Sequence, residues 1–460
     1  MKKIMYIVLF FILLWISMVV VDYFRIKKFE KPIFVLSIES EEMQLKKYHG
    51  LGYSVDIEGI WTSDGVLVKI LKYTYRIFGI YVETNCQKYG LPQVYIEGNM
   101  DEMLSKADER NVIINYISND IRFNSYARIK LQGASSLEFE KKNYNIKLYT
   151  DSTYKNKNKI DVGWGEQNKY CLKANWVDKT HARNIVTAEL VSQIQAKYNI
   201  LDQTQNNGMV SGYPVEIYIN GKYHGLYTWN IPKDAWLLGM DEDNENHIAF
   251  FSEKLNKSNV FLGEAKYGEW TLEVGEENEA NLQKLNEVIN FVAKSDDDVF
   301  RREFEKYINL DAAINYVIML QFAGLMDNIS RNMLFATWDG KQWYPILYDL
   351  DNSWGMQPDG HTMYTSLDFI MYIKLWERII DVFPQEVYIR YCDLRESLLT
   401  KEYIMGLFND FKSKIPQEAW EREKLRWKDI PGMDYSQIEE FLDQRIPMVD
   451  SYMEKLNVKR

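Results

Sequence analysis

The chain begins with one uninterrupted apolar run. Residues 4–21 are apolar apart from one serine, and two lysines precede them. At about 1.5 Å per residue, this length is just sufficient to cross a bilayer as a helix. A cleaved signal peptide would have a shorter run and small residues before the cut, whereas this run ends in methionine and three valines. We therefore expect a short tail over 1–3 and an uncleaved transmembrane anchor over 4–21.

The next stretch, residues 32–88, alternates between apolar and polar positions. Three parts of it are rich in β-branched and aromatic residues, namely 52–58, 66–71 and 73–82. Such alternation is typical of strands with one buried face. Asp64-Gly65 adds a turn signal between two of them. The pattern predicts a small β-rich module over 32–88.

From about residue 91 the pattern becomes mixed. Strands are predicted at 126–131 and 144–149, a helix from about 180 to 197, and a hairpin whose two strands meet at Asn220-Gly221. Beyond residue 280 helical periodicity dominates. The helical stretches are 280–294, 299–326 and several between 385 and 455. The expected class is α+β, with a smaller β-rich lobe followed by a helical lobe over 91–455.

Composition removes several functional classes. The chain has 460 residues, 46% of them hydrophobic and 26% charged, with 66 acidic against 55 basic side chains and a formal charge of −11. A strongly acidic balance lacks the positive surface that nucleic-acid binding requires, so we expect no nucleic-acid partner. The three cysteines are far apart and only 5 histidines are present. We therefore expect neither a disulfide framework nor a zinc site.

Oxygen-bearing side chains flank a predicted hairpin late in the chain. Asp327 stands five residues before Asn332, which opens a predicted strand, and the returning strand ends at Asp349 and Asp351. The hairpin brings its two ends together, so these four groups are expected to share one site. Such oxygens suit Mg²⁺ or Mn²⁺. The Asp-x₄-Asn spacing also matches a kinase catalytic loop, in which the Asp orients the substrate hydroxyl and the Asn holds metal. The alternative is that each acid merely forms a turn or a helix cap.

A second candidate set lies earlier, in the β-rich part. Lys147, inside a predicted strand, could reach nucleotide phosphates while Glu189 of the next helix holds it by charge pairing. Solvated lysines that protect a strand edge are the alternative. Before this strand lies a loop with one glycine and two serines, whose backbone N–H groups could cradle phosphate, and Lys142 is an alternative phosphate ligand. The loop residues are Gly133, Ser135 and Ser136.

Together these segments resemble the spore-coat protein H (CotH) kinase family. The resemblance is carried by several motifs in order, at 128–136, 141–147, 178–184, 215–227, 327–332 and 349–355. It departs from the family pattern in two places. Tyr348 stands where Trp is expected, and Asn230-Ile231-Pro232 follows the hairpin where an acidic residue is usual. The N-terminal anchor and residues 32–88 lie outside the resemblance.

The resemblance implies a divergent, two-lobed protein-kinase-like fold that uses ATP and Mg²⁺ or Mn²⁺ to phosphorylate Ser or Thr of envelope or spore-coat proteins. Asp327 would be the catalytic Asp, Asn332 a metal ligand, and either Asp349 or Asp351 the metal-binding acid. Arg183-Asn184 matches a family motif, with fold support and phosphate contact both open. The implied location is a bacterial cell envelope, with the soluble part favoured on the extracytoplasmic side, although basic residues flank both ends of the anchor.

Two other functions compete with a kinase. A pseudokinase scaffold would share the fold and bind partners without turnover. A membrane-tethered carbohydrate-binding protein is suggested by 13 Trp and 32 Tyr, although aromatic residues more often build cores. Metal-dependent ATP binding and phosphoryl transfer separate these alternatives.

Overall fold

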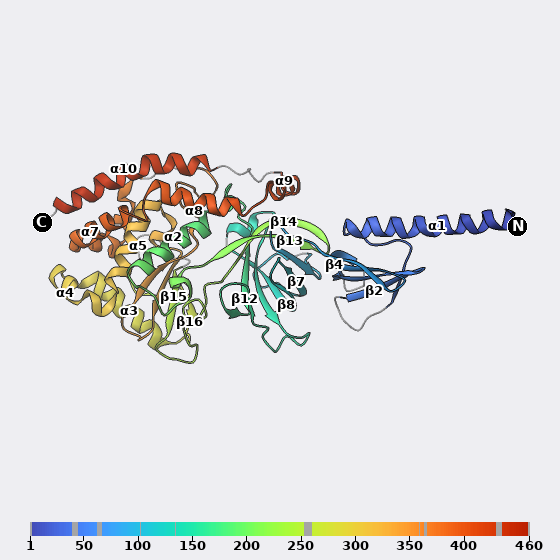
Figure 1. The fold of residues 1–460 in the computed structure, drawn as a ribbon. Coiled ribbons are helices and arrows are strands. Elements are labelled where there is room, and N and C mark those ends of the chain that lie inside the picture. Colours follow the sequence, from blue (N-terminus) through green and yellow to red (C-terminus); the bar gives the residue numbers. More distant parts are fainter. Residues whose placement is uncertain are drawn as a thin grey trace. The chain divides into compact units, whose positions relative to one another are not determined.

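The computed structural model describes residues 2–38, 45–61, 67–101, 103–133, 135–252, 260–357, 359–362, 366–428 and 435–458, with the side chain of Ser135 outside the description. The predicted turn at Asp64-Gly65 therefore lies outside the described residues. Figure 1 shows the order of the elements along the chain. They form two compact units. One comprises Met1–Glu102, Arg110–Ala127 and Glu216–His224, and the other comprises Met103–Glu109, Arg128–Val215 and Gly225–Arg460.

The strands have the following bounds. They are β1 (Leu36–Ile38), β2 (Leu45–Gly50), β3 (Tyr53–Trp61), β4 (Leu67–Ile77), β5 (Ile80–Cys86), β6 (Gln93–Glu97), β7 (Glu109–Ile117), β8 (Arg122–Gln132), β9 (Asn143–Tyr149), β10 (Ile160–Asp161), β11 (Glu166–Gln167), β12 (Lys169–Lys173), β13 (Gly212–Ile219), β14 (Lys222–Asn230), β15 (Ile248–Ser252), β16 (Trp270–Val274), β17 (Met333–Thr337) and β18 (Tyr344–Leu347).

The helices have the following bounds. They are α1 (Lys2–Lys27), α2 (Arg183–Lys197), α3 (Glu279–Lys294), α4 (Asp297–Tyr307), α5 (Leu310–Ala323), α6 (Lys374–Val382), α7 (Pro384–Arg395), α8 (Lys401–Ser413), α9 (Gln417–Arg426) and α10 (Ser436–Val458). Short 3₁₀ turns are η1 (Ser135–Glu138), η2 (Gln205–Gly208), η3 (Asp327–Ile329), η4 (Leu350–Asn352) and η5 (Leu367–Tyr372).

The first unit contains a five-stranded antiparallel sheet in the order β1 to β5. Side chains of β3 alternate between buried and half-buried positions, as the sequence pattern predicts. The buried face packs against the C-terminal half of α1 through Val19 and Ile26. Asp22 of α1 is fully buried there, and it accepts hydrogen bonds from the Ile33 and Phe34 backbone N–H groups (2.7 and 2.9 Å) and from Tyr53 (2.6 Å). The last turns of α1 are therefore part of the core of this unit.

A closed barrel follows in the order β12-β14-β13-β6-β7-β8-β9. Strands β8 and β9 contain the two predicted strands at 126–131 and 144–149, and Asn220-Gly221 joins β13 to β14 as predicted. Within the second unit, β12 pairs antiparallel with both β9 and β14. Side chains at alternate positions of β9 and β12 therefore project to a common side.

The second unit also holds a four-stranded sheet, β16-β15-β17-β18, and helices α2 to α10. Helix α5 is buried along nearly its whole length and ends at Gly324, whose φ of 68° is a left-handed cap that glycine adopts readily. The predicted helical stretch 299–326 was too long, because two helices occupy it. The first ends at Tyr307, and Asn309 caps the second by accepting a hydrogen bond from the Ala312 backbone N–H.

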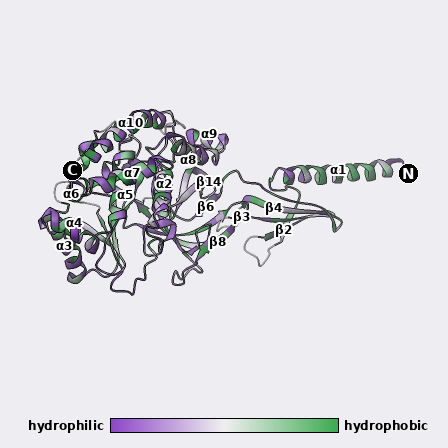
Figure 2. Ribbon diagram, turned by 60° about the vertical axis from the view of Figure 1, so that its left-hand side comes forward, coloured by the Kyte–Doolittle hydropathy of each residue, from purple (hydrophilic) through white to green (hydrophobic). Residues whose placement is uncertain are grey.

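Aromatic side chains serve mainly as core in the described residues. Five tryptophans are fully buried, namely Trp229, Trp270, Trp343, Trp354 and Trp376. Figure 2 shows the complementary picture for α1, which is coloured mostly as hydrophobic although it stands outside any core over its N-terminal half. In the part of the chain that the structure describes, α1 is the one helix long and apolar enough to cross a membrane. The fold class is mixed α+β, with sheets, helices and an apolar N-terminal helix.

Candidate active site

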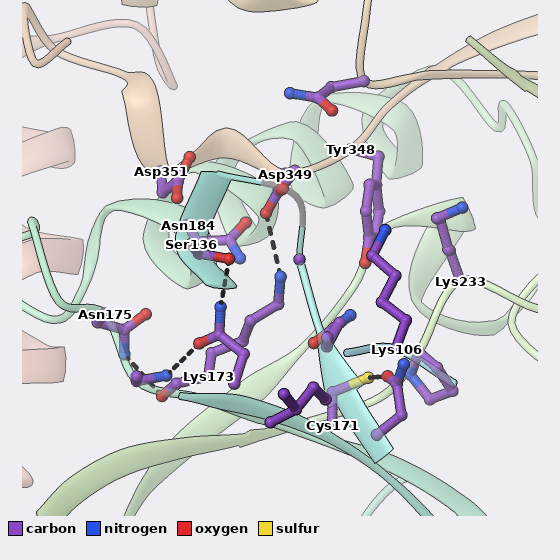
Figure 3. A pocket seen from close by; sticks show the side chains of 18 of the residues that line it. Lys106, Ser136, Cys171, Lys173, Asn175, Asn184, Lys233, Tyr348, Asp349 and Asp351 are labelled. Atoms are coloured by element: carbon purple, nitrogen blue, oxygen red, sulfur yellow. Dashed lines mark hydrogen bonds and ion pairs between the residues drawn. The ribbon is translucent and has the colours of Figure 1, made fainter. Parts of the chain in front are cut away.

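A cavity of about 650 Å³ opens within the second unit. One wall comes from β9 and β12, and the facing wall comes from the segments that flank the β17–β18 hairpin (Figure 3). The wall residues that bear on its chemistry are Gly133, Ser136, Lys141, Asn143, Lys147, Lys173, Asn184, Asp327, Asn332, Asp349, Asp351 and Asn352. A space of this size is within the range of small-molecule and cofactor sites.

The acidic wall is built by the β17–β18 hairpin. Asn332 donates a hydrogen bond from Nδ2 to Oδ2 of Asp327 at 2.8 Å, and its backbone C=O accepts from Tyr348 at 3.0 Å. Asn332 and Asp349 both have left-handed backbones, with φ of 51° and 55°. Asparagine and aspartate tolerate that conformation better than most residues. The hairpin therefore places Asp327, Asn332 and Asp349 on one cavity, as the sequence predicts.

Asp349 and Asp351 form an acidic pair next to a buried lysine. Lys173, at the end of β12, lies 3.3 Å from Oδ1 of Asp349 (Figure 3). Burial is the largest single influence and opposes its charge, but Asp349, Tyr348, Cys171 and Asp351 together exceed it, and the net effect raises the pKa of the Lys173 amine. Burial and the charge of Asp349 raise the pKa of the Asp351 carboxyl well above its usual range. The two carboxylates therefore repel one another, and Lys173 offsets only part of the effect on Asp351.

The glycine loop lies at the cavity as well. Gly133 has φ of 114°, and a Cβ atom at this position would meet the Ser136 hydroxyl oxygen. Asn143 fixes this hydroxyl by donating to it at 3.2 Å, and its own Oδ1 accepts the Ala174 backbone N–H at 2.6 Å. Ser135 can be placed only by its backbone, in η1, because its side chain lies outside the described residues. Glycine is required here both for conformation and for close approach.

The predicted lysine and glutamate are not brought together. Lys147 lines the cavity from β9, opposite Lys169 of β12. Glu189, on α2, is not among the cavity-lining residues, and its carboxylate accepts a hydrogen bond from Gln193 at 2.8 Å. Lys142 also points elsewhere and donates to the Leu137 carbonyl at 2.6 Å. This geometry gives no support to a Lys147–Glu189 pair or to Lys142 as a phosphate ligand.

Lys173 is the site residue that the sequence reasoning missed. It belongs to the segment Lys169–Lys173, in which lysine, cysteine and lysine alternate with apolar residues. That alternation places Lys169, Cys171 and Lys173 on one face of β12, and all three line the cavity. The sequence signal that could have predicted this residue is a lysine at the end of an alternating strand. The contact with Asp349 depends on residues 176 positions apart and was not visible in the pattern.

The motif from Asp178 to Asn184 holds the start of α2 and the acidic wall in place. Asp178 is buried, pairs with the Arg183 guanidinium, and accepts backbone N–H groups that begin α2. Burial is the largest single influence and works against its charge, but Arg183 and the hydrogen bonds from Thr180 and the Arg183 backbone together lower the pKa of the Asp178 carboxyl. Asn184 lines the cavity and accepts the Leu350 backbone N–H at 3.0 Å, which fixes the acidic wall between Asp349 and Asp351. Arg183 therefore supports the fold.

Another buried ion pair anchors the glycine-loop side. Lys141 donates from Nζ to Glu423 of α9 at 2.6 Å and to the Ala174 carbonyl at 2.8 Å, and both charged side chains are buried. The second carboxylate oxygen of Glu423 accepts the Leu226 backbone N–H at 2.6 Å. Burial lowers the pKa of the Lys141 amine, and Glu423 opposes that effect.

Comparison with known proteins assigns the chain to a family. The family model described as CotH kinase protein matches residues 129–449, more than half of the chain. The chain belongs to the CotH kinase family. A search among curated proteins gave no match. The CotH match encloses both cavity walls, begins later than the predicted boundary at 91, and leaves α1 and β1–β5 outside.

CotH kinase membership supports a kinase-like phosphotransferase at the level of the family, with ATP and a divalent metal as its general requirements. In the described residues, no three His, Cys, Asp or Glu side chains come together as a complete metal site. The oxygen donors present still fit a metal that is completed by phosphates and water, as Mg²⁺ usually is. One further donor is available, because Oδ1 of Asn352 is buried at the cavity with no hydrogen-bond partner in the described structure.

Proposed function

We propose that this chain is a membrane-anchored, metal-dependent protein kinase that transfers the γ-phosphate of ATP to Ser or Thr of envelope or spore-coat proteins, on a divergent two-lobed kinase-like fold. The observation that carries the proposal is the single cavity shared by Asp327, Asn332, the Asp349/Asp351 pair and Lys173. It combines a candidate catalytic carboxylate, oxygen ligands for a cation and a buried positive charge.

Each group has a role that its surroundings permit. Asp327, fixed by Asn332, would orient the acceptor hydroxyl and take its proton. Asp349, Asp351 and Asn332 would hold Mg²⁺ or Mn²⁺, which when bound neutralises phosphate charge. Lys173, and not the predicted Lys147, is best placed to contact the phosphates beside the metal, because it already touches Asp349.

The glycine loop would contact the nucleotide through its backbone. Gly133 leaves room beside Ser136 that a side chain would fill. Backbone N–H groups in such loops bind phosphate without needing a charged side chain. Lys147 remains a candidate contact for the outer phosphates or the acceptor, since it lines the same cavity.

Three variants test the site. Asp327→Asn should abolish transfer of radiolabelled phosphate from ATP, to the protein itself or to casein, while nucleotide affinity changes little. Asp349→Ala and Asp351→Ala should instead weaken Mn²⁺-dependent binding of a fluorescent ATP analogue. The matched control is Asp359→Asn, an exposed carboxylate outside the cavity, which should behave as wild type.

The outcomes discriminate between the competing functions. Wild-type turnover in all three cavity variants would show that the assignment is wrong. Metal-dependent ATP binding without transfer in the wild type would identify a pseudokinase scaffold. Glycan binding that is indifferent to Asp349→Ala would favour the carbohydrate-binding alternative.

We also propose that α1 is a retained single-pass anchor, with the soluble part on the extracytoplasmic side. Its retention is supported by Trp15 and Val19, which pack against the sheet and which a cleavage after the apolar run would remove. Cys86 is exposed, so a membrane-impermeant maleimide should label it in intact cells. Labelling only after lysis would place the soluble part inside.

A further inference from the structure

The apolar surface of α1 continues onto the sheet beside it. Two hairpin tips of the first unit, Leu51-Gly52 between β2 and β3 and Phe78-Gly79 between β4 and β5, lie next to the middle of the helix. Trp15 donates a hydrogen bond to the Leu51 carbonyl at 2.6 Å and stacks on the Phe78 ring at 5.6 Å. Figure 1 shows the β2–β4 region running alongside α1.

The tips are apolar and open. The side chains of Leu51, Phe78 and Ile80 are 71%, 71% and 72% exposed. Tyr81 and Val82 continue the exposed apolar surface along β5. Exposed apolar residues scattered singly need no explanation, but a contiguous group beside a membrane-length helix does.

The helix and the tips change from apolar to polar at the same level. Along the β4–β5 hairpin, the first charged residues on either side of the tip are Arg76 and Glu83. At about 3.3 Å per residue they lie roughly 7–10 Å back from the tip. Along α1, the apolar run ends at Asp22, which is about 10 Å from Trp15 at 1.5 Å per residue.

Contacts confirm that these two boundaries coincide. Tyr23, two residues past the end of the apolar run, donates to Glu83 at 3.2 Å, and Lys27 lies 3.8 Å from the same carboxylate. Tyr75, which faces Glu83 across the hairpin, donates to the Val19 carbonyl at 3.2 Å. The strand hairpin and the helix therefore share one polar–apolar boundary.

We infer that the hairpin tips, defined as Leu51 and residues 78–82, embed in the same membrane leaflet as α1. The inference rests on the proposed insertion of α1. The occupant is a lipid bilayer because the tips are continuous with the helix surface, and because their apolar depth matches the 5–10 Å reached by interfacial protein segments. Deeper insertion is excluded by the unpaired edge of β5, whose backbone groups need water.

Embedding gives the first unit two kinds of attachment. A unit held by α1 alone could tilt together with the helix in the bilayer. With tips and helix both in the leaflet, the sheet stands at a fixed height, with Asp22 and Glu83 at the lipid surface. The sheet then acts as a rigid mount and not as a flexible linker.

Site-specific fluorescence tests the inference on the full chain in phosphatidylcholine vesicles. All variants carry Cys392→Ser, and Cys171 is buried. An environment-sensitive NBD label is placed at native Cys86, at Ile80→Cys with Cys86→Ser, or at Leu9→Cys with Cys86→Ser. A variant with both accessible cysteines replaced measures background labelling. Cys86 is the matched control, on the same strand about 20 Å from Ile80.

The fluorescence emission of the label at position 80 should be blue-shifted relative to that of the label at position 86. A lipid that carries a nitroxide at a shallow depth should quench the label at position 80 about twofold more than the label at 86. Iodide dissolved in the water should quench the label at position 80 less than the label at 86. Label at position 9 should be quenched by a deep nitroxide. If position 9 is in lipid while position 80 behaves like 86, the inference fails and the anchor stands. If position 9 is in water, both fail. Protection of position 80 from iodide without lipid quenching would mean that protein covers the tips, and would also overturn the inference.

Discussion

Lys173 is the charge on which the acidic wall depends. It stands at the end of β12, 12% exposed and 3.3 Å from Asp349, and the charges of both residues act on Asp351. Replacing it with methionine keeps the length of the side chain and removes the charge. The two carboxylates, which already repel one another, would then lose the lysine that pairs with Asp349.

The distance sets the size of the effect. At 3.3 Å and an effective dielectric constant of about 20, the attraction between Lys173 and Asp349 is roughly 5 kcal/mol. Breaking a buried pair costs about 3–5 kcal/mol, and the partial exposure of Asp349 puts this pair at the lower end. We expect Lys173→Met to lower the free energy of unfolding by about 3 kcal/mol. Asp349→Asn should cost only about 1–2 kcal/mol, since it also relieves repulsion on Asp351.

Urea denaturation measures both changes, and the same strand supplies a control. Lys169, four residues earlier, pairs with Asp234 at 3.1 Å but is 33% exposed. Lys169→Met should therefore cost no more than about 1 kcal/mol. Added Mn²⁺ should stabilise Lys173→Met more than wild type, because a dication at the acidic pair restores the missing positive charge.

Two results would refute this reasoning. Equal destabilisation by Lys173→Met and Lys169→Met would show that the wall does not depend on the lysine charge. Mn²⁺ that stabilises wild type and Lys173→Met equally would show that metal does not bind at the acidic pair.

Three further predictions concern the surroundings of the site. Glu423→Gln should lower the free energy of unfolding, measured by urea denaturation, by about 3–5 kcal/mol, because it leaves the buried Lys141 charge without its carboxylate partner. Adding Lys141→Met to this variant should recover part of that loss. If the effects of the two substitutions were strictly additive, the two side chains would not form a direct pair. Burial, followed by the charge of Lys141, lowers the pKa of His181 to about 3. Since the unfolded chain takes up this proton near pH 6.5, stability should fall by roughly 2 kcal/mol between pH 7.5 and 5 on account of His181, and His181→Asn should lose that part of the pH dependence. Gly133→Ala should weaken ATP binding in a nucleotide titration about tenfold, whereas Gly163→Ala, at a similar φ of 112° with open space around it, should not.

Much of the local structure was predictable from the sequence. The strands at 126–131 and 144–149, the turn at Asn220-Gly221 and the β17–β18 hairpin follow from period-two patterns and turn residues, which act over a few positions. The helical stretch 299–326 was misjudged because Asn309 looks like an interior polar residue until its side chain is seen to cap α5.

The acidic half of the candidate site was likewise within reach of the sequence. Asp327, Asn332 and Asp349 are joined by one hairpin, so local pairing alone brings them together. The basic half was not. The choice of Lys173 over Lys147 depends on which end of β12 faces a segment 176 residues away, and periodicity carries no information about such long-range contacts.

The sequence by itself determined the apolar helix, the strand alternation, the hairpin acids and the membership of the CotH kinase family, because each of these depends on residues that are close together in the sequence. Only the tertiary structure decided that Lys173 pairs with Asp349, that Glu189 does not line the cavity, and that the tips at Leu51 and Phe78 contact Trp15. These depend on the packing of distant segments, where burial and charge select one arrangement among many that the same local patterns would allow.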